Sequence, residues 1–350
     1  MEFNIGNVRV GGDRTVIIAE AGVNHLGRMD YAEELIKTAA RAGADIVKFQ
    51  TYKAKKLTTQ NAPRFWNWEG ENVKDGSQFD SYSVLDSFER EQYAQLIELC
   101  DRYNVAFMST PFDPEGVDML VDIGMKGFKI ASGDLTNIPF LRHIARKNLP
   151  VMLSTGAAEV PEIERAVKVF EDAGNRQLCI MHCTLCYPTQ SKDANLSALL
   201  DIKAHFPDYV LGLSDHTLGT IVPAASVLYG VKAIEKHYTF DKTLPDSADH
   251  WLSLNEEELA RLVADVRELE QAVGCGKKVL LECELPAHRG ARRSIVAARN
   301  IRKGEVLSDA NLAIKRPAGG ISPAEYDAVI GRTAARDLEE DELLTLADLA

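Results

Sequence analysis

The sequence predicts an α/β fold, a (β/α)8 TIM barrel followed by a small β-rich domain. The chain has 350 residues, more than one hydrophobic core usually organises, so we expect two domains or a barrel with an appendage. Over about the first 270 residues, short β-branched apolar runs alternate with amphipathic segments. After residue 290 this alternation gives way to short strands and turns. Alternating strands and helices are typical of a parallel sheet with right-handed crossovers.

Eight strand patterns are present, and a helical pattern follows each of them. The expected strands are the apolar runs at 16–19, 46–49, 106–109, 127–130, 151–154, 178–181, 210–214 and 233–237. The expected helices, where apolar residues recur every three or four positions, cover 31–42, 90–103, 114–123, 138–147, 160–173, 196–205, 220–228 and 254–273. Eight such units in this length fit a barrel. An open doubly wound sheet is the alternative, but the turn after the first strand, Glu20 to His25, lacks its usual glycine-rich fingerprint.

Two segments depart from the strand–helix repeat. The connection between Gln50 and Arg90 is long, and it starts at a strand end, where barrel enzymes keep their active-site loops. We therefore expect a lid or substrate loop there; a surface excursion packed by its own aromatic residues is the alternative. Those aromatic residues are Trp66, Trp68, Phe79 and Tyr82. The second departure is the tail, which gives expected domains of 1–280 for the barrel, 281–290 for a linker and 291–350 for the small domain.

Composition narrows the class of protein. Hydrophobic residues make up 45% of the chain and charged residues 26%, which is normal for a globular protein. We find no apolar run near the roughly 20 residues of a membrane-spanning helix, and no export signal. Six cysteines are ordinary usage for a cytosolic protein, and a net charge of −12 argues against a nucleic-acid-binding surface. We expect a cytoplasmic protein that binds neither nucleic acid nor membranes.

Polar or ionisable residues end all eight strand patterns. In a barrel these ends meet on one face, where active sites are built. Ionisable groups inside strands are expensive to bury without partners, so their accumulation predicts an active site. In chain order they are Glu20, Asn24 and His25; Lys48 and Gln50; Ser109 and Thr110; Lys129 and Ser132; Ser154 and Thr155; His182, Cys183 and Thr184; Ser214, Asp215 and His216; and Glu235, Lys236 and His237.

Lys48 and Lys129 lie within strand patterns two strands apart. Together with the neighbouring hydroxyl groups they would form an anion-binding pocket suited to a phosphate and a carboxylate. Schiff-base catalysis by a desolvated lysine is an alternative. The third possibility is that each lysine merely pairs with a buried carboxylate such as Glu20 or Glu235.

His216 and His237 end neighbouring strands. Two converging imidazoles, with water and substrate oxygens, would hold a divalent first-row cation. Structural histidines are the alternative. The Cys183-x-x-Cys186 spacing has no second CxxC and no zinc-spaced histidine pair, so we interpret these cysteines as loop thiols.

Six motifs in this order resemble the sialic acid synthase family, the nonulosonate synthases, which includes N-acetylneuraminate, legionaminate and pseudaminate synthases. They are IAEAGVNHLG at 18–27, VKFQT at 47–51, STPFD at 109–113, KIASG at 129–133, LSTG at 153–156 and GLSDHT at 212–217. The tail, with Lys315-Arg316-Pro317 and Gly331-Arg332, resembles the antifreeze-like (SAF) domain of that family. The resemblance covers essentially the whole chain.

The resemblance implies a reaction. Members condense phosphoenolpyruvate and water with an open-chain N-acyl amino sugar to give a nine-carbon 2-keto-3-deoxy sugar acid and phosphate. We expect an N-acetylneuraminate synthase-type enzyme that uses an N-acyl mannosamine-type sugar such as N-acetylmannosamine. The alternative is a legionaminate or pseudaminate synthase that uses a 6-deoxy diacetamido sugar, and the sequence does not separate these acceptors from N-acetylmannosamine 6-phosphate. A Schiff-base sugar-acid aldolase and a non-catalytic carbohydrate-binding protein remain the alternatives from other classes.

The resemblance also implies roles for particular residues. Phosphoenolpyruvate would be bound by Lys48, Thr110, Lys129, Ser132, Ser154 and Ser214. The catalytic residues would be Glu20, as acid/base, with Lys48 and Lys129. The sugar would be bound by Gln50, Tyr187, Asp249 and Arg316. His216 and His237 would hold Mn²⁺, with Mg²⁺ or Co²⁺ as alternatives.

Two further implications concern assembly and a departure from the family pattern. The family resemblance implies a domain-swapped homodimer, in which Arg316 reaches the acyl group of a sugar bound in the partner's barrel. After His182-Cys183-Thr184, many members have Asn or Ser where this chain has Leu185. We expect this change to weaken one contact to the phosphate.

Overall fold

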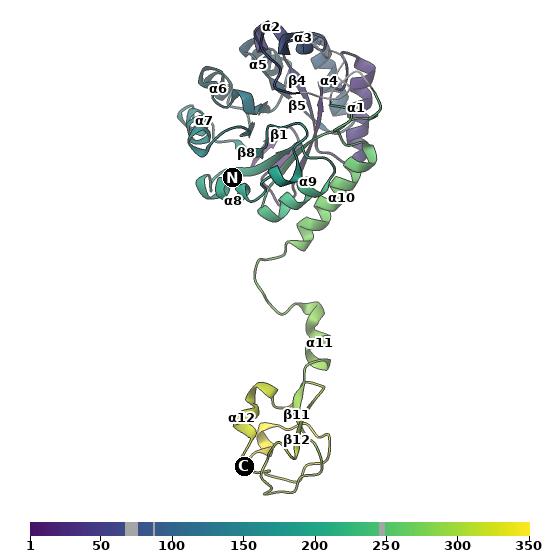
Figure 1. The fold of residues 1–350 in the computed structure, drawn as a ribbon, viewed down its shortest axis with the longest axis vertical. Coiled ribbons are helices and arrows are strands. Elements are labelled where there is room, and N and C mark those ends of the chain that lie inside the picture. The colour runs from purple at the N-terminus through teal and green to yellow at the C-terminus, as the bar shows by residue number, and fades with distance from the viewer. Residues whose placement is uncertain (67–75, 87, 245–248) are drawn as a thin grey trace. The chain divides into compact units, whose positions relative to one another are not determined.

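The computed structural model describes residues 1–66, 76–86, 88–244 and 249–350. They form two compact units, Met1–Gly274 and Cys275–Ala350 (Figure 1). Trp68, which we expected in the aromatic loop, lies outside the described residues. None of the described helices is both long enough and apolar enough to cross a membrane.

The first unit is a closed barrel of parallel strands, so the predicted fold class is confirmed. Around the barrel the strands follow the order β10-β3-β4-β5-β6-β7-β8-β9. Their bounds are β3 Val16–Gly22, β4 Ile46–Thr51, β5 Ala106–Pro111, β6 Phe128–Ile130, β7 Val151–Ser154, β8 Leu178–Cys183, β9 Val210–Asp215 and β10 Ala233–His237. Several strands run further toward their carboxyl ends than the apolar runs predict, because the polar residues there still pair with neighbouring strands.

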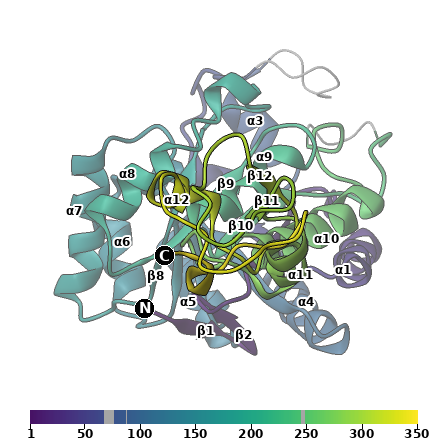
Figure 2. The same cartoon turned by 90° about the horizontal axis from the view of Figure 1, so that it is seen from below.

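Helices surround the barrel. They are α1 Met29–Ala42, α4 Arg90–Arg102, α5 Pro114–Asp122, α6 Ile138–Ala145, α7 Val160–Asp172, α8 Ala198–His205, α9 Ile221–Ala225 and α10 Glu256–Ala272. In Figure 2, α6, α7 and α8 lie on one side of the barrel and α1, α4 and α10 on the other. Local signals set their ends: the side chain of Asp113 caps α5, Asn255 and Glu258 form a capping box on α10, and Gly43 ends α1 in the left-handed region at φ 84°.

The barrel interior is divided into two halves. Side chains alternate along each strand, so every second residue points inward. In the amino-terminal half these residues are apolar, and they pack in one cluster that includes Ile18, Ile46 and Met108. A hairpin of β1 (Phe3–Ile5) and β2 (Val8–Val10) joins this cluster, so apolar side chains fill this end of the barrel. The sequence did not predict the hairpin, because three-residue strands are too short to show a period.

The long connection after β4 lies beside the carboxyl end of the barrel. It contains α2 (Ala54–Leu57) and α3 (Gln78–Ser83), and Ser77 and Asp80 form a capping box at the start of α3. Tyr82 contacts two other aromatic rings, with centroids 5.6 Å from Tyr52 and 5.8 Å from Trp66. Tyr52, Trp66 and Tyr82 thus form an aromatic cluster beside the strand ends.

The second unit has a small core of its own. Strands β11 (Ser294–Ala297) and β12 (Leu312–Lys315) pair antiparallel, and the short helix α12 (Tyr326–Val329) contributes Val329 to an apolar cluster. Other members of the cluster include Ile295, Leu307, Ile321 and Leu344. Residues 281–290, expected as a linker, form a 3₁₀ turn at Glu282–Glu284 and α11 (Leu285–Gly290), neither with a buried side chain.

Candidate active site

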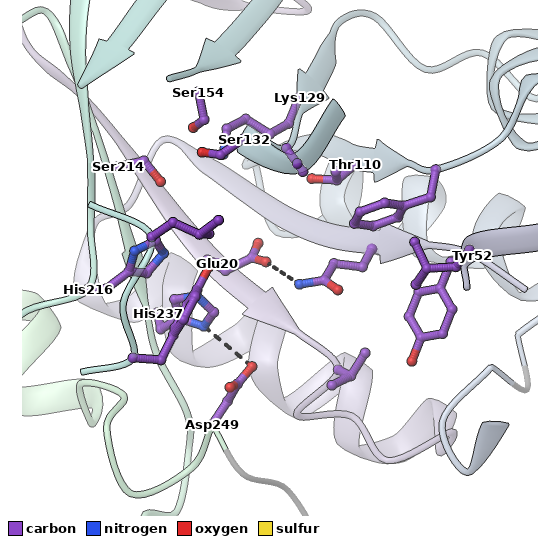
Figure 3. Close-up of a pocket in the computed structure, with 18 of the residues that line it drawn as sticks. Glu20, Tyr52, Thr110, Lys129, Ser132, Ser154, Ser214, His216, His237 and Asp249 are labelled. Carbon is purple, nitrogen blue, oxygen red and sulfur yellow. Dashed lines mark hydrogen bonds and ion pairs between the residues drawn. The ribbon is translucent and has the colours of Figure 1, made fainter. Parts of the chain in front are cut away.

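A cavity of about 450 Å³ lies at the carboxyl ends of the strands (Figure 3). All of the site residues predicted within the barrel line it: Glu20, Lys48, Gln50, Thr110, Lys129, Ser132, Ser154, Tyr187, Ser214, His216, His237 and Asp249. Arg316 is different, because it belongs to the second unit and is exposed there. The structure therefore brings together every predicted site residue of the barrel.

Strand register explains this convergence. Glu20 on β3 lies opposite Lys48 on β4, and Ser214 on β9 lies opposite both Cys183 on β8 and Glu235 on β10. Because side chains alternate along a strand, these residues point inward one step beyond the apolar cluster. Polar side chains that are distant in the sequence thus form one layer.

Four buried ions of alternating sign cross this layer. Lys48 Nζ lies 2.7 Å from Glu20 Oε2 and 3.8 Å from Glu235 Oε1. Lys129 Nζ donates a hydrogen bond of 2.8 Å to the same Oε1 of Glu235. All four side chains are no more than 4% exposed. The row carries no net charge, which makes its burial tolerable.

Burial and pairing move the pKa values within this row in opposite directions. Burial raises the pKa of Glu20, and the attraction of Lys48 offsets only part of that rise. Burial also acts against the ammonium of Lys48, but the carboxylates of Glu20 and Glu235 outweigh it and raise the pKa of Lys48. Burial disfavours the carboxylate of Glu235 too, yet Lys129 and Lys48 hold its pKa below the usual range. Glu20 is therefore the carboxylate better suited to exchange a proton, and Glu235 the permanent anion.

Hydroxyl groups surround the two lysines. Thr110 Oγ1 accepts a hydrogen bond of 2.9 Å from Lys48, and Ser214 Oγ donates one of 3.0 Å to Glu235 Oε1. Ser132 Oγ accepts a hydrogen bond of 2.9 Å from the backbone N–H of Gly156. The buried Ser154 Oγ makes no hydrogen bond within the described residues. Buried hydroxyls are normally paired, so Ser154 points to a ligand that accepts its proton.

The two histidines meet the requirements of metal ligands. His216 Nδ1 lies 3.0 Å from the carbonyl oxygen of Thr184, which places the proton on Nδ1 and leaves the lone pair on Nε2. His237 Nδ1 is buried and makes no hydrogen bond within the described residues. Burial lowers the pKa of each imidazole to about 3, with a further contribution from His237 at His216 and from Lys48 at His237. Both are therefore neutral at pH 7, as metal ligation requires.

The histidine pair is not a complete protein cage. The ring centroids of His216 and His237 are 5.5 Å apart. Among the residues that the structure describes, no group of three or more His, Cys, Asp or Glu side chains is arranged to hold a metal ion. A cation bound here would need water or substrate oxygens as further ligands, an arrangement suited to a catalytic rather than a structural site.

The residues predicted to contact the sugar lie next to these groups. Gln50 Nε2 donates a hydrogen bond of 3.1 Å to Glu20 Oε1, and Asp249 Oδ2 lies 3.6 Å from His237 Nδ1. Burial, together with repulsion from Glu20, raises the pKa of Asp249 to about 7. The ring of Tyr187 lies over that of His216, with centroids 4.1 Å apart.

The opposite side of the cavity is apolar. Figure 3 shows Tyr52 across the cavity from His216 and His237. The apolar and aromatic lining residues include Tyr52, Leu57, Phe65, Trp66, Tyr82, Val84, Leu85 and Phe112. We call these residues the aromatic wall. The cavity therefore has an ionic floor and an apolar side.

The sequence analysis gave no role in the site to one central residue. It placed Glu235 at a strand end and named it as a possible partner of a lysine, and the structure shows that Glu235 contacts Lys48, Lys129 and Ser214 at once. The signal was present, because Glu235 stands two positions before His237 and so points to the same side of β10. Leu185 also lines the cavity, and its Cβ would lie 3.1 Å from a side-chain carbon added to Gly156.

Comparisons with known proteins agree with the geometry. Residues 35–278 match the model of the NeuB family, and residues 292–350 match that of the SAF domain. The protein belongs to the NeuB family.

Relatives and solved structures support this assignment over most of the chain. The chain is 40% identical to an N,N'-diacetyllegionaminic acid synthase of Campylobacter jejuni, over 95% of this chain and 99% of the relative. It is 31% identical to the human N-acetylneuraminate-9-phosphate synthase, over 96% of this chain and 93% of that relative. The crystal structure of a sialic acid synthetase from Leptospira borgpetersenii, in complex with citrate, superposes with a TM-score of 0.72 at 34% identity, covering 82% of this chain and 94% of that one.

We predict that Glu235→Ala lowers the free energy of unfolding by about 3–5 kcal/mol, because it leaves the buried ammonium of Lys129 without its carboxylate. Urea denaturation measures this loss. Inorganic phosphate should raise the melting temperature of the variant more than that of the wild type, because an anion can replace the missing carboxylate.

The matched control is Asp172→Ala, which removes an exposed ion pair between Lys168 and Asp172. It should change the stability by about 0.5 kcal/mol or less. A Glu235→Ala variant as stable as the wild type would show that the lysines do not depend on this carboxylate.

Proposed function

We propose that this protein condenses phosphoenolpyruvate with the open-chain aldehyde of an N-acyl amino sugar and releases phosphate. The observation that carries the proposal is one cavity in which two buried lysines, several hydroxyls, a carboxylate of raised pKa and two neutral imidazoles meet. Relatives named N,N'-diacetyllegionaminic acid synthase, N-acetylneuraminate-9-phosphate synthase and pseudaminic acid synthase agree with it.

Phosphoenolpyruvate would bind at the ionic floor. Its carboxylate and phosphate are anions, and Lys48 and Lys129 are buried cations that line the cavity. The hydroxyls of Thr110, Ser132, Ser154 and Ser214 would donate the remaining hydrogen bonds to its oxygens. Since each lysine already contacts a carboxylate, the substrate would exchange one anion for another rather than face bare ammonium groups.

Glu20 would act as the acid/base. In the condensation, C3 of phosphoenolpyruvate bonds to the aldehyde carbon, whose oxygen takes up a proton, while water adds to C2 and loses one. The bond between C2 and the phosphate oxygen then breaks, which releases phosphate and leaves the keto group. Glu20 lies among the reacting groups, with Lys48 on one oxygen and Gln50 on the other. Its raised pKa suits a group that accepts a proton and later returns it.

His216 and His237 would hold a divalent cation, with Mn²⁺ as our first choice and Mg²⁺ or Co²⁺ as alternatives. When bound, such a cation supplies Lewis-acid polarisation of a carbonyl oxygen. The fixed tautomer of His216 and the neutral state of both rings support this assignment.

The aromatic wall favours one class of acceptor. With the aldehyde directed toward the histidines, the remote end of the sugar would reach the opposite side of the cavity, where Tyr52 and its neighbours lie. Methyl and acetamido groups suit such a surface better than hydroxyls or a phosphate do. Two relatives at 40% and 38% identity are N,N'-diacetyllegionaminic acid synthases. We therefore propose a 6-deoxy diacetamido sugar in preference to N-acetylmannosamine or its 6-phosphate.

The geometry does not favour a Schiff-base aldolase. A lysine nucleophile must lose its proton, and its site must therefore lower its pKa. Here the surrounding carboxylates raise the pKa of Lys48, and Lys129 pairs with Glu235. Borohydride with pyruvate should therefore trap no covalent adduct.

Phosphate release from phosphoenolpyruvate, measured with Mn²⁺ across the three acceptors, tests the function and the acceptor separately. We expect kcat/KM to be roughly tenfold or more higher for the diacetamido sugar, as apolar pockets discriminate on this scale. A preference for N-acetylmannosamine would overturn the acceptor only. No phosphate release and no new sugar acid, by mass, with any acceptor would overturn the function.

We predict that Glu20→Gln keeps phosphoenolpyruvate affinity and loses ~10²–10⁴-fold in turnover, the usual contribution of a general acid–base group. The amide preserves the shape of the side chain, and Lys48 keeps its contacts with Thr110 and Glu235. Calorimetry and steady-state kinetics measure the two effects. A near-normal rate with weakened binding would make Glu20 a positioning residue instead.

We also propose a homodimer in which the second unit of one chain serves the barrel of its partner. Arg316 is exposed, and its guanidinium suits a hydrogen bond to an acyl oxygen. The unit is small and has its own core, so it can be exchanged as a body.

Subunit mixing tests this arrangement. Lys129→Ala and Arg316→Ala should each be nearly inactive as pure homodimers. After subunit exchange, activity should return, because one site of the hybrid has both an intact barrel and an intact Arg316. Native mass spectrometry confirms hybrid formation, and hybrids without recovered activity would show that Arg316 does not act across subunits.

A further inference from the structure

A second buried ion pair lies on the outer face of the same two strands that carry the histidines. Asp215 on β9 and Lys236 on β10 are direct partners in the parallel register. Their side chains are 4% and 1% exposed. Because side chains alternate along a strand, the next residues, His216 and His237, face the cavity. Each half of this outer pair thus immediately precedes one imidazole.

The contacts of this pair enclose the backbone around His216. Lys236 Nζ donates to Asp215 Oδ2 at 2.6 Å, and Thr217 Oγ1 donates to the same oxygen at 2.9 Å. Lys236 Nζ also donates to the carbonyl oxygen of Thr217. One ammonium, adjacent to His237, therefore binds the residue before His216 and the residue after it. We call Asp215, Thr217 and Lys236 the outer cluster.

Stability alone is a poor reason for such a cluster. A fully buried ion pair gains little over apolar residues of the same size, because desolvation offsets most of the attraction. The cluster instead fixes geometry, because an ammonium that donates hydrogen bonds to fixed acceptors restricts the positions of the chain segments that carry them. Here those acceptors belong to the chain on both sides of His216, at the point where β9 leaves the barrel.

We propose that the outer cluster consists of positioning residues, which hold His216 and His237 at the separation that a shared cation requires. The inference rests on the metal site of the proposed function. It assigns to Asp215, Thr217 and Lys236 no contact with substrate or metal. Ligand orientation by outer partners is worth roughly 10–100-fold in metal affinity in protein sites generally.

The test is a variant that keeps the packing of the outer cluster and removes its ion pair and hydrogen bonds. Asp215→Leu, Thr217→Val and Lys236→Met together replace the outer cluster with apolar side chains of similar size, so the chain should unfold near the wild-type temperature. Titration of the full chain with Mn²⁺ alone, followed by electron paramagnetic resonance, should show binding weakened by roughly 10–100-fold. Phosphoenolpyruvate affinity, which depends on the inner lysines, should fall much less.

The matched control is Lys242→Met, which removes a 2.6 Å ion pair between Lys242, in the connection after β10, and Glu258 on α10. It should leave Mn²⁺ affinity unchanged. His216→Ala separates the two hypotheses, because Mn²⁺ binding equal to the wild type's in that variant would overturn the metal site itself.

If His216→Ala loses Mn²⁺ while the folded triple variant binds it like the wild type, the positioning role is wrong. Should the triple variant fail to fold, Asp215→Asn takes its place, since it keeps the shape and removes the charge. Unchanged Mn²⁺ affinity in Asp215→Asn would equally overturn the proposal, and weakened affinity at an unchanged melting temperature would support it.

Discussion

The site depends on the burial, inside the barrel, of four ions whose charges sum to zero. A single carboxylate or ammonium in that position would be neutralised or excluded, because its desolvation has no compensation. Alternation of sign along Glu20, Lys48, Glu235 and Lys129 provides that compensation before any substrate arrives. The carboxylates therefore hold the ammonium groups in place, and the oxygens of an incoming anion can make the same kind of contact with those ammonium groups. Such a preorganised site needs little rearrangement when charge moves during a reaction.

The apolar half of the barrel makes this layer possible. Below the ionic row, inward side chains from several strands pack with Phe3, Ile5 and Val10 of the amino-terminal hairpin. A side-chain carbon added to Gly127 would come within 2.9 Å of Ile5, so little room remains at that contact. Strands held this firmly at one end keep their registers at the other, and the registers place Glu20 beside Lys48 and Glu235 beside Ser214.

Sequence reasoning found the barrel because its signal is long and repeated. Eight strand–helix units leave few other topologies, and each strand end marks itself by polar residues after an apolar run. It therefore also found the residues that line the cavity, from Glu20 on β3 to His237 on β10. The roles of those residues came from the family resemblance, since periodicity carries no information about substrate.

The features of the structure that the sequence could not predict are those that depend on contacts between residues far apart in the chain. The central position of Glu235 follows from contacts with side chains on three other strands, and no local pattern records them. Hairpin β1–β2 is too short for periodicity, and the inward approach of Tyr52 and Phe112 depends on how the strand ends turn. The same holds for Arg316 of the second unit. It is exposed there, and the group that we propose it contacts belongs to another subunit.

In strands β9 and β10 the side chains alternate between the two faces of the barrel wall, and both faces carry ionised residues. Ordinary barrel strands are apolar on the face toward the helices, and most strands here follow that rule through residues such as Val47, Phe107 and Leu153. The last two strands depart from it, because Asp215 and Lys236 place a second ion pair on the outer face, each directly after a residue of the inner layer, Ser214 or Glu235. Two ionic layers back to back are costly to bury, and hydrophobic residues would satisfy the fold at least as well. The outer ion pair immediately precedes the two imidazoles. A need for fixed geometry at the ends of these strands therefore explains it better than a need for stability does.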